Sequence, residues 1–289
     1  MKQKKILIGC CSVLSCLILF GCATEMNHTA TSSDGVKISF DVQGQGKPAI
    51  IFIHGWANNR SIWDAQVSHF SKKYKVVNID LPGFGQSGNN RQEWTIAAFG
   101  KDVVAVMEKL NIEKVILVGF SLGASISIEA ANITPERIAG VVLVDDLQNV
   151  EEKYPPPVVS YMDSLYMDLV INPTVEKLVN YGFIKNNPEE SFARVLPMLK
   201  DAPRPGWRES ILGYMEWINE SCEESLKKCQ VPIRAINADM IPTNVEAFRK
   251  LVPSFQADIV PDVGHVIMWD AEEEFNRLLE KNIQAFVNQ

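Results

Sequence analysis

Cysteine is scarce in the part of this 289-residue sequence that is expected to fold. Four of the six cysteines lie within the first 22 residues, which leaves Cys222 and Cys229. These two residues are seven positions apart in a segment with a helical pattern. On a continuous helix this spacing is about 10 Å of rise, which is too far for a disulfide. We therefore expect no structural disulfide, and neither cysteine lies in a motif typical of a nucleophile.

A surplus of basic residues is also missing. The formal net charge is −7 at pH 7, and the first 21 residues contain three lysines and no acidic residue. Removal of that segment would make the remaining chain still more negative. Such a charge disfavours nucleic acids and anionic lipid surfaces as partners. The sequence also lacks internal repeats and low-complexity tracts, and its composition is that of an ordinary globular protein.

The N-terminal segment has too short an apolar run for a comfortable membrane span. Three lysines precede apolar residues 6–20, a pattern typical of a secretory signal. The run ends in Leu19-Phe20-Gly21-Cys22, which resembles the lipobox of bacterial lipoproteins, whose cysteine becomes the lipidated first residue. The resemblance implies a signal peptide over residues 1–21, a tether over 22–33, and an exported protein with a lipid anchor in the bacterial cell envelope. An ordinary signal peptide or a signal anchor is the alternative.

Buried strands alternate with helices in two stretches, residues 34–146 and 230–289. This alternation predicts an α/β fold with a mostly parallel, doubly wound sheet that is covered by helices on both faces. Between residues 147 and 229, prolines separate short helical segments and no strand is expected. We therefore predict a helical insertion after the sixth strand. The strands with a clear pattern cover residues 36–42, 49–53, 74–79, 114–118, 140–144, 232–237 and 255–260, and the main helices cover 61–70, 95–110, 125–132, 245–251 and 271–287.

A serine lies where the strand over residues 114–118 passes into a helix. Gly119-Phe120-Ser121-Leu122-Gly123 fits G-x-S-x-G, a motif that needs a strand, a sharp turn and a helix in that order. The backbone of such a serine is strained, and side chains two residues on either side would collide with it. Ser121 is therefore the candidate nucleophile, and a helix-capping serine is the alternative.

A serine hydroxyl becomes a nucleophile when an imidazole accepts its proton, a carboxylate orients that imidazole, and N–H groups stabilise the oxyanion. His265 follows the last strand in a loop that contains glycine, so its ring can point back over the sheet. Asp239 follows the preceding strand, and we expect it to be the acid of the triad. Asp145 and Asp146, at the end of the strand before the insertion, are the alternative.

The order Ser121, Asp239, His265 resembles that of the α/β-hydrolase fold family with an inserted cap, and the similarity runs from about residue 36 to the C-terminus. The segment His54-Gly55-Trp56 resembles the His-Gly-x loop of that family. This resemblance implies an oxyanion hole made by the backbone N–H groups of Trp56 and Leu122, with the histidine bracing the loop. The turn over residues 80–87 resembles a structural turn of the family. The family pattern implies a core over 34–146 and 230–289 and a cap over 147–229.

The resemblance implies a carboxylesterase-like serine hydrolase that cleaves ester-like bonds of a small molecule through an acyl-enzyme, with no metal or organic cofactor. Bulky apolar residues are frequent in the insertion, so we expect an apolar substrate site. Serine at the position of the nucleophile argues against the haloalkane dehalogenase and epoxide hydrolase branches. The alternatives are a C–C bond hydrolase, a perhydrolase, a hydroxynitrile lyase or a peptidase with the same triad, or a lipid-anchored binding module without catalysis.

Overall fold

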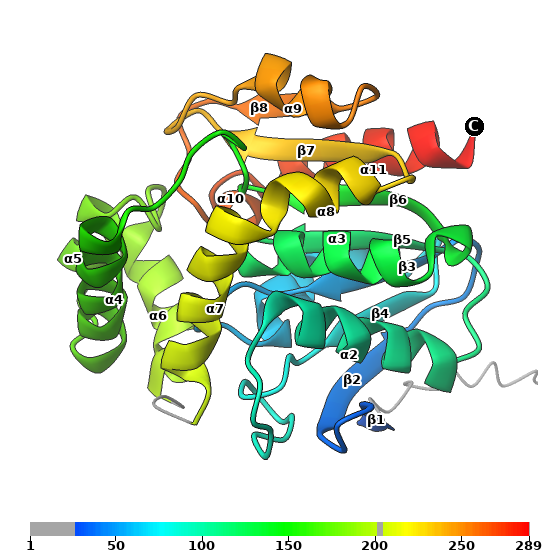
Figure 1. Ribbon diagram of the computed structural model, residues 1–289, viewed down its shortest axis with the longest axis horizontal. Helices are drawn as coiled ribbons and strands as arrows, with labels where there is room; N and C mark the ends of the chain where they lie inside the picture. The colour runs from blue at the N-terminus through cyan, green and yellow to red at the C-terminus, as the bar shows by residue number, and fades with distance from the viewer. Residues whose placement is uncertain (1–26, 201–204, 289) are drawn as a thin grey trace, which may run out of the picture.

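The computed structural model describes residues 27–200 and 205–288, and in this part eight strands form one sheet (Figure 1). The strand order is β1-β2-β4-β3-β5-β6-β7-β8. The pairs β1–β2 and β2–β4 are antiparallel, and the five later pairs are parallel. The mostly parallel sheet predicted from the sequence is thus confirmed. The strands are β1 (His28–Thr31), β2 (Lys37–Gln43), β3 (Ala49–Ile53), β4 (Val76–Ile79), β5 (Val115–Phe120), β6 (Ile138–Val144), β7 (Ile233–Ala238) and β8 (Gln256–Val260).

Both faces of the sheet are covered because alternate residues of the central strands point to opposite sides. In β3, Ile51 and Ile53 pack into one buried cluster, and Ile50 and Phe52 pack into the other. A strand buried on both faces needs apolar residues throughout, so its segment is an unbroken apolar run. The first cluster includes residues of α2 (Ile96–Lys109), α3 (Leu122–Ile133), α8 (Cys222–Lys228) and α9 (Val245–Leu251), and the second includes residues of η1 (Arg60–Trp63), α1 (Asp64–Phe70), α10 (Ile267–Asp270) and α11 (Glu272–Val287).

The chain between β6 and β7 forms a helical cap, as the sequence predicts. Helices α4, α5 and α6 lie to one side of the sheet, beyond the ends of its strands, whereas α8 runs back along α3 (Figure 1). The carboxylate of Glu129 on α3 accepts hydrogen bonds from Trp217 of α7 and Ser225 of the α8 helix, which fixes this part of the cap to the core. The cap helices before α8 are α4 (Pro156–Ile171), α5 (Val175–Asn180), α6 (Pro188–Lys200) and α7 (Trp207–Glu220), and the short helix η2 (Pro135–Arg137) precedes β6.

The folded core begins earlier than the sequence predicts. Residues 28–31, assigned to the tether, form β1 and pair with β2, so the prediction of a tether up to residue 33 is wrong. Only Ala30 of this four-residue strand is buried, which leaves too short an alternation to recognise in the sequence. The predicted signal peptide and Cys22 lie outside the described residues. Within residues 27–200 and 205–288, no helix has the length and apolar character needed to cross a membrane.

The two cysteines of the folded domain are free thiols, which confirms the expectation drawn from their spacing. Cys222 is the first residue of α8, and Cys229 follows the last residue of that helix. The helix holds the two side chains apart along its axis.

Candidate active site

Ser121 lies at a sharp turn between β5 and α3, with φ 51° and ψ −126°. A non-glycine residue rarely adopts a positive φ, and such strain persists only where the surroundings enforce it. Here Ser121 N–H donates a hydrogen bond to Val144 O at 2.9 Å. A Cβ atom on Gly119 would lie 2.1 Å from Gly123 O, and one on Gly123 would lie 2.5 Å from Ile53 O. Both glycines of the motif are therefore required by close backbone contacts.

The side chain of Ser121 lines a cavity of about 260 Å³ between the core and the cap. Trp56, Leu122 and His265 of the core line the same cavity. The wall is predominantly apolar. Residues from the cap side include Tyr154, Met162, Tyr166, Leu169, Val170, Leu178, Tyr181, Phe183, Ile184, Val195, Leu199, Ile211 and Tyr214.

The imidazole of His265 is held by Asp145. His265 Nδ1 lies 2.6 Å from Asp145 Oδ2, and the side chain of Asp145 is nearly buried. The second oxygen, Asp145 Oδ1, accepts hydrogen bonds from Ala238 N–H at 2.8 Å and from Gln148 Nε2 at 3.1 Å. A carboxylate fixed in this way favours the tautomer with a proton on Nδ1, which leaves Nε2 free to accept one.

Asp239, the acid expected from the sequence, is not the partner of His265. Its side chain is exposed, and its Oδ1 accepts a hydrogen bond from Asp262 N–H at 3.1 Å. Asp239 N–H still pairs with Val260 O of β8, so its side chain turns toward the loop after that strand. The prediction that Asp239 orients His265 is therefore wrong, and Asp145, one of the two alternatives, has this position.

The loop that carries His265 is fixed by the cap and by its own chain. His265 N–H donates to Gly182 O of the cap at 2.8 Å. The carboxylate of Asp270 accepts from Gly264 N–H at 2.7 Å. Burial raises the pKa of Asp270, and the backbone donors around its carboxylate oppose that shift. The rings of Phe120 and His265 lie 4.6 Å apart between centroids, so the imidazole packs beside the turn that carries Ser121.

The two residues predicted as oxyanion donors, Trp56 and Leu122, line the same cavity as Ser121. Leu122 is the first residue of α3, so its N–H has no carbonyl partner within the helix. Trp56 follows β3, and its indole Nε1 donates to Trp207 O at 2.7 Å. This bond joins the loop after β3 to the first residue of α7.

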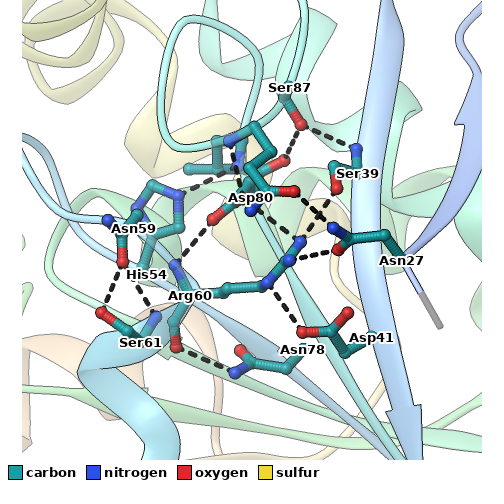
Figure 2. A network of polar contacts seen from close by, with 12 residues as sticks. Asn27, Ser39, Asp41, His54, Asn59, Arg60, Ser61, Asn78, Asp80 and Ser87 are labelled. Atoms are coloured by element: carbon teal, nitrogen blue, oxygen red, sulfur yellow. Dashed lines mark hydrogen bonds and ion pairs between the residues drawn. The ribbon is translucent and has the colours of Figure 1, made fainter. Parts of the chain in front are cut away.

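His54 lies inside a polar network next to this loop and is fully buried (Figure 2). Its Nε2 accepts a hydrogen bond from Leu81 N–H at 3.0 Å, and its Nδ1 lies 2.7 Å from Gly55 O. Nδ1 therefore carries the proton and donates to that carbonyl. Burial lowers the pKa of His54, which favours the neutral ring. These contacts fit the bracing role that the family resemblance implies.

Asp80 is the centre of the same network (Figure 2). Its Oδ1 accepts from Arg60 N–H at 2.8 Å, and its Oδ2 accepts from Gln86 N–H at 2.9 Å. Ser87 Oγ donates to Asp80 O at 2.6 Å and accepts from Ser39 N–H at 2.8 Å. The turn over residues 80–87 thus ties the end of β4 to β2 and η1. These contacts are those of a structural turn.

The arrangement places a hydroxyl and an imidazole oriented by a carboxylate on one largely apolar cavity, which suits proton transfer to and from a bound molecule. Among the described residues, no three His, Cys, Asp or Glu side chains are grouped so as to hold a metal ion. Sequence reasoning missed Gln148 and Asp270, which position the pair His265–Asp145. No motif or spacing pattern marks either residue.

The comparisons with known proteins agree with this architecture. A family model described as "alpha/beta hydrolase fold" matches residues 48–196, which is more than half of the chain. An uncharacterized protein of Mycobacterium tuberculosis is 24% identical over 268 residues, which cover 86% of this chain and 78% of that protein. A thermophilic esterase of Thermogutta terrifontis has a TM-score of 0.75 at 19% identity, with 90% of this chain and 99% of that one covered. An esterase of Exiguobacterium antarcticum has a TM-score of 0.77 at 19% identity, with 90% and 100% covered.

Proposed function

Because the chain belongs to the α/β-hydrolase fold family, we propose that it is a serine hydrolase that cleaves ester bonds of a small, largely apolar substrate. The observation that carries the proposal is the hydrogen bond from His265 to Asp145, with that imidazole and Ser121 on the same cavity. Two of the similar solved structures are esterases, which supports an ester as the substrate. The cavity of about 260 Å³ suits a small molecule.

The proposed reaction proceeds through an acyl-enzyme. Ser121 Oγ attacks the ester carbonyl while His265 Nε2 accepts the hydroxyl proton, and Asp145 stabilises the imidazolium that forms. The N–H groups of Trp56 and Leu122 hold the oxyanion of the tetrahedral intermediate. His265 then protonates the leaving alcohol. A water molecule, deprotonated by His265, attacks the acyl group, and Ser121 recovers its proton as the carboxylic acid leaves.

We expect a fluorophosphonate probe to label the wild-type protein at Ser121, because only an activated serine attacks such a phosphorus centre at neutral pH. Labelling is measured by mass spectrometry of the tryptic peptide. Ser121→Ala is expected to abolish labelling, whereas Ser164→Ala, at an exposed serine of the cap, is expected to leave it unchanged. The same proteins are assayed with nitrophenyl esters of graded acyl length. A folded wild-type protein that neither reacts with the probe nor hydrolyses any of these esters would contradict the proposal.

We also propose that the protein is exported and held at a membrane of the bacterial cell envelope by a lipid on Cys22. The support is the sequence Leu19-Phe20-Gly21-Cys22 after the apolar run. The folded domain already includes Asn27, whose side chain donates to Gln86 Oε1 at 2.6 Å. The five Cα-to-Cα steps from Cys22 to Asn27 span at most about 18 Å. A lipid on this cysteine would therefore keep the domain close to the bilayer.

Replacing Cys22 by alanine is expected to release the mature protein from membranes or to leave an unprocessed precursor, because the acyl chains supply the anchoring free energy. Fractionation of cells and the mass of the mature N-terminus measure this outcome. Cys16→Ala, inside the apolar run, is the matched control and is expected to mature normally. Unchanged membrane association and normal processing of Cys22→Ala would contradict lipidation at this residue.

A further inference from the structure

A second carboxyl group, that of Asp146, lies in the cavity wall and has no part in the proposed reaction. Its residue is 6% exposed. Oδ1 accepts a hydrogen bond from the hydroxyl of Tyr214 at 2.5 Å, and Oδ2 lies 3.4 Å from Ser125 Oγ. The backbone N–H of Leu147 also donates to this carboxylate, and all three partners are neutral. Because the two oxygens of a carboxylate offer about four acceptor positions, Asp146 retains capacity for a further donor or a cation.

The backbone around Asp146 is unusual on both sides. Asp145 has φ 48° and Leu147 has φ 54°, both in the left-handed region that non-glycine residues seldom adopt. The turn sends the first carboxylate to His265 and the second toward Tyr214 of the cap. Backbone strain of this kind is concentrated at binding and catalytic positions, where the surrounding structure enforces it and it fixes the direction of a functional side chain.

The surroundings of Asp146 are aromatic and lack a fixed positive charge. Among the described residues that line the cavity there is no lysine or arginine, and His265 is the one basic side chain. Tyr166 and Asp146 line the same cavity, and burial, followed by the charge of Asp146, raises the pKa of the Tyr166 phenol to about 12. The ring of Trp56 meets that of Tyr166 edge to face, with 5.3 Å between centroids. Faces of tryptophan and tyrosine attract cations, most strongly where water is excluded.

We infer that this cavity binds the ammonium group of a cationic ester, with Asp146 as its counter-ion and Trp56 and Tyr166 as an aromatic wall. Burial raises the pKa of the Asp146 carboxyl to about 7, and the hydrogen bond from Tyr214 opposes that shift. A cation bound beside this carboxyl favours its charged form, whereas an anion disfavours it. The inference concerns the substrate class of the proposed hydrolase and rests on that proposal for turnover. Binding of the ammonium group requires only the cavity and can be measured without any reaction.

The binding test compares choline with 3,3-dimethylbutan-1-ol, its neutral isostere, on Ser121→Ala protein by calorimetry. We expect choline to bind at least about ten-fold more tightly than the neutral alcohol, since only choline interacts with both the carboxylate and the ring faces. Asp146→Asn, made in the same background, is expected to remove this preference while it keeps the shape of the side chain. Glu108→Gln, which removes one charge from an exposed position of α2, is the control and is expected to keep the preference.

Tyr214→Phe separates a binding role of Asp146 from a purely structural one. The variant removes the hydrogen bond between α7 and Asp146 but leaves the carboxylate, so choline binding is expected to stay within about three-fold or to strengthen. Equal loss of choline binding in Tyr214→Phe and Asp146→Asn would overturn the inference, as would equal affinity of Ser121→Ala protein for the two alcohols. Should Asp146→Asn fail to fold, Tyr166→Leu replaces it and is expected to weaken choline binding alone.

A turnover assay distinguishes failure of this inference from failure of the proposed function. The wild-type protein is assayed with butyrylcholine and with 3,3-dimethylbutyl butyrate. Faster hydrolysis of the choline ester, by kcat/KM, is the expected result. Hydrolysis of both esters without a preference would overturn the ammonium site and keep the hydrolase. Tight choline binding without hydrolysis of either ester, together with no reaction with a fluorophosphonate, would support the ammonium site and contradict the hydrolase.

Discussion

Asp145→Asn is expected to lower kcat for a nitrophenyl ester by about 10⁴-fold while the protein stays folded. The asparagine Oδ1 can still accept from Ala238 N–H and Gln148, so the turn after β6 keeps its hydrogen bonds. The new Nδ2 faces His265 Nδ1, where Oδ2 stood at 2.6 Å. Since Nδ2 is a donor, it favours the tautomer with the proton on Nε2, and that ring cannot accept the proton of Ser121.

Asp239→Asn is the matched control for this prediction. It makes the same chemical change at the acid that the sequence favoured, and its exposed side chain accepts only a backbone hydrogen bond in the next loop. We expect its kcat to stay within about three-fold of the wild type, in line with surface substitutions elsewhere. Circular dichroism of both variants verifies the fold. A mild effect of Asp145→Asn, or a large one of Asp239→Asn, would refute the assignment of Asp145 as the triad acid.

Gly119→Ala is expected to destabilise the protein by about 4 kcal/mol or more, or to prevent folding. The added Cβ atom would lie 2.1 Å from Gly123 O and 2.4 Å from Ser127 Oγ. Both distances are much shorter than the sum of the van der Waals radii of the two atoms concerned. The first of these is backbone at the start of α3, so relief of the clash would move the helix and the turn that carries Ser121. Urea denaturation followed by circular dichroism measures the change in the free energy of unfolding.

Gly35→Ala is the control for the loss of glycine itself. Gly35 has φ +88°, and an added Cβ there meets no atom within 4 Å. Its cost is therefore limited to backbone strain, which we expect to be about 1 kcal/mol. Comparable stability of Gly119→Ala and wild type would show that β5 and α3 separate readily, contrary to the tight turn described above.

Local patterns in the sequence predict most of the core. The segments 49–53 and 245–251 form β3 and α9 with the expected bounds, because an unbroken apolar run and a short amphipathic run are each strong signals. The four-residue β1 carries no such signal and forms because β2 offers it an open edge. The sheet order, with β4 between β2 and β3, also depends on pairing between distant segments.

In the candidate site, too, some residues could be predicted from the local sequence and others could not. Ser121 could be predicted because close contacts within the turn and with the end of β3 require its two glycines, and His265 could be predicted because it follows the last strand. The choice between Asp145 and Asp239 could not, since both follow neighbouring parallel strands, β6 and β7, and both meet the requirement of chain position. It depends on where the loop after β8 brings the imidazole, and the cap fixes that loop through Gly182.

The sequence by itself therefore determined the parallel sheet, the inserted cap and the serine at the end of β5. Each of these follows from short-range physical constraints: apolar periodicity, proline breaks and the lack of space beside a tight turn. Only the tertiary structure decided which carboxylate orients His265 and which remains in the cavity wall. Hydrogen-bond partners of that kind come from segments 68 and 120 residues apart, and their meeting depends on the packing of the whole chain.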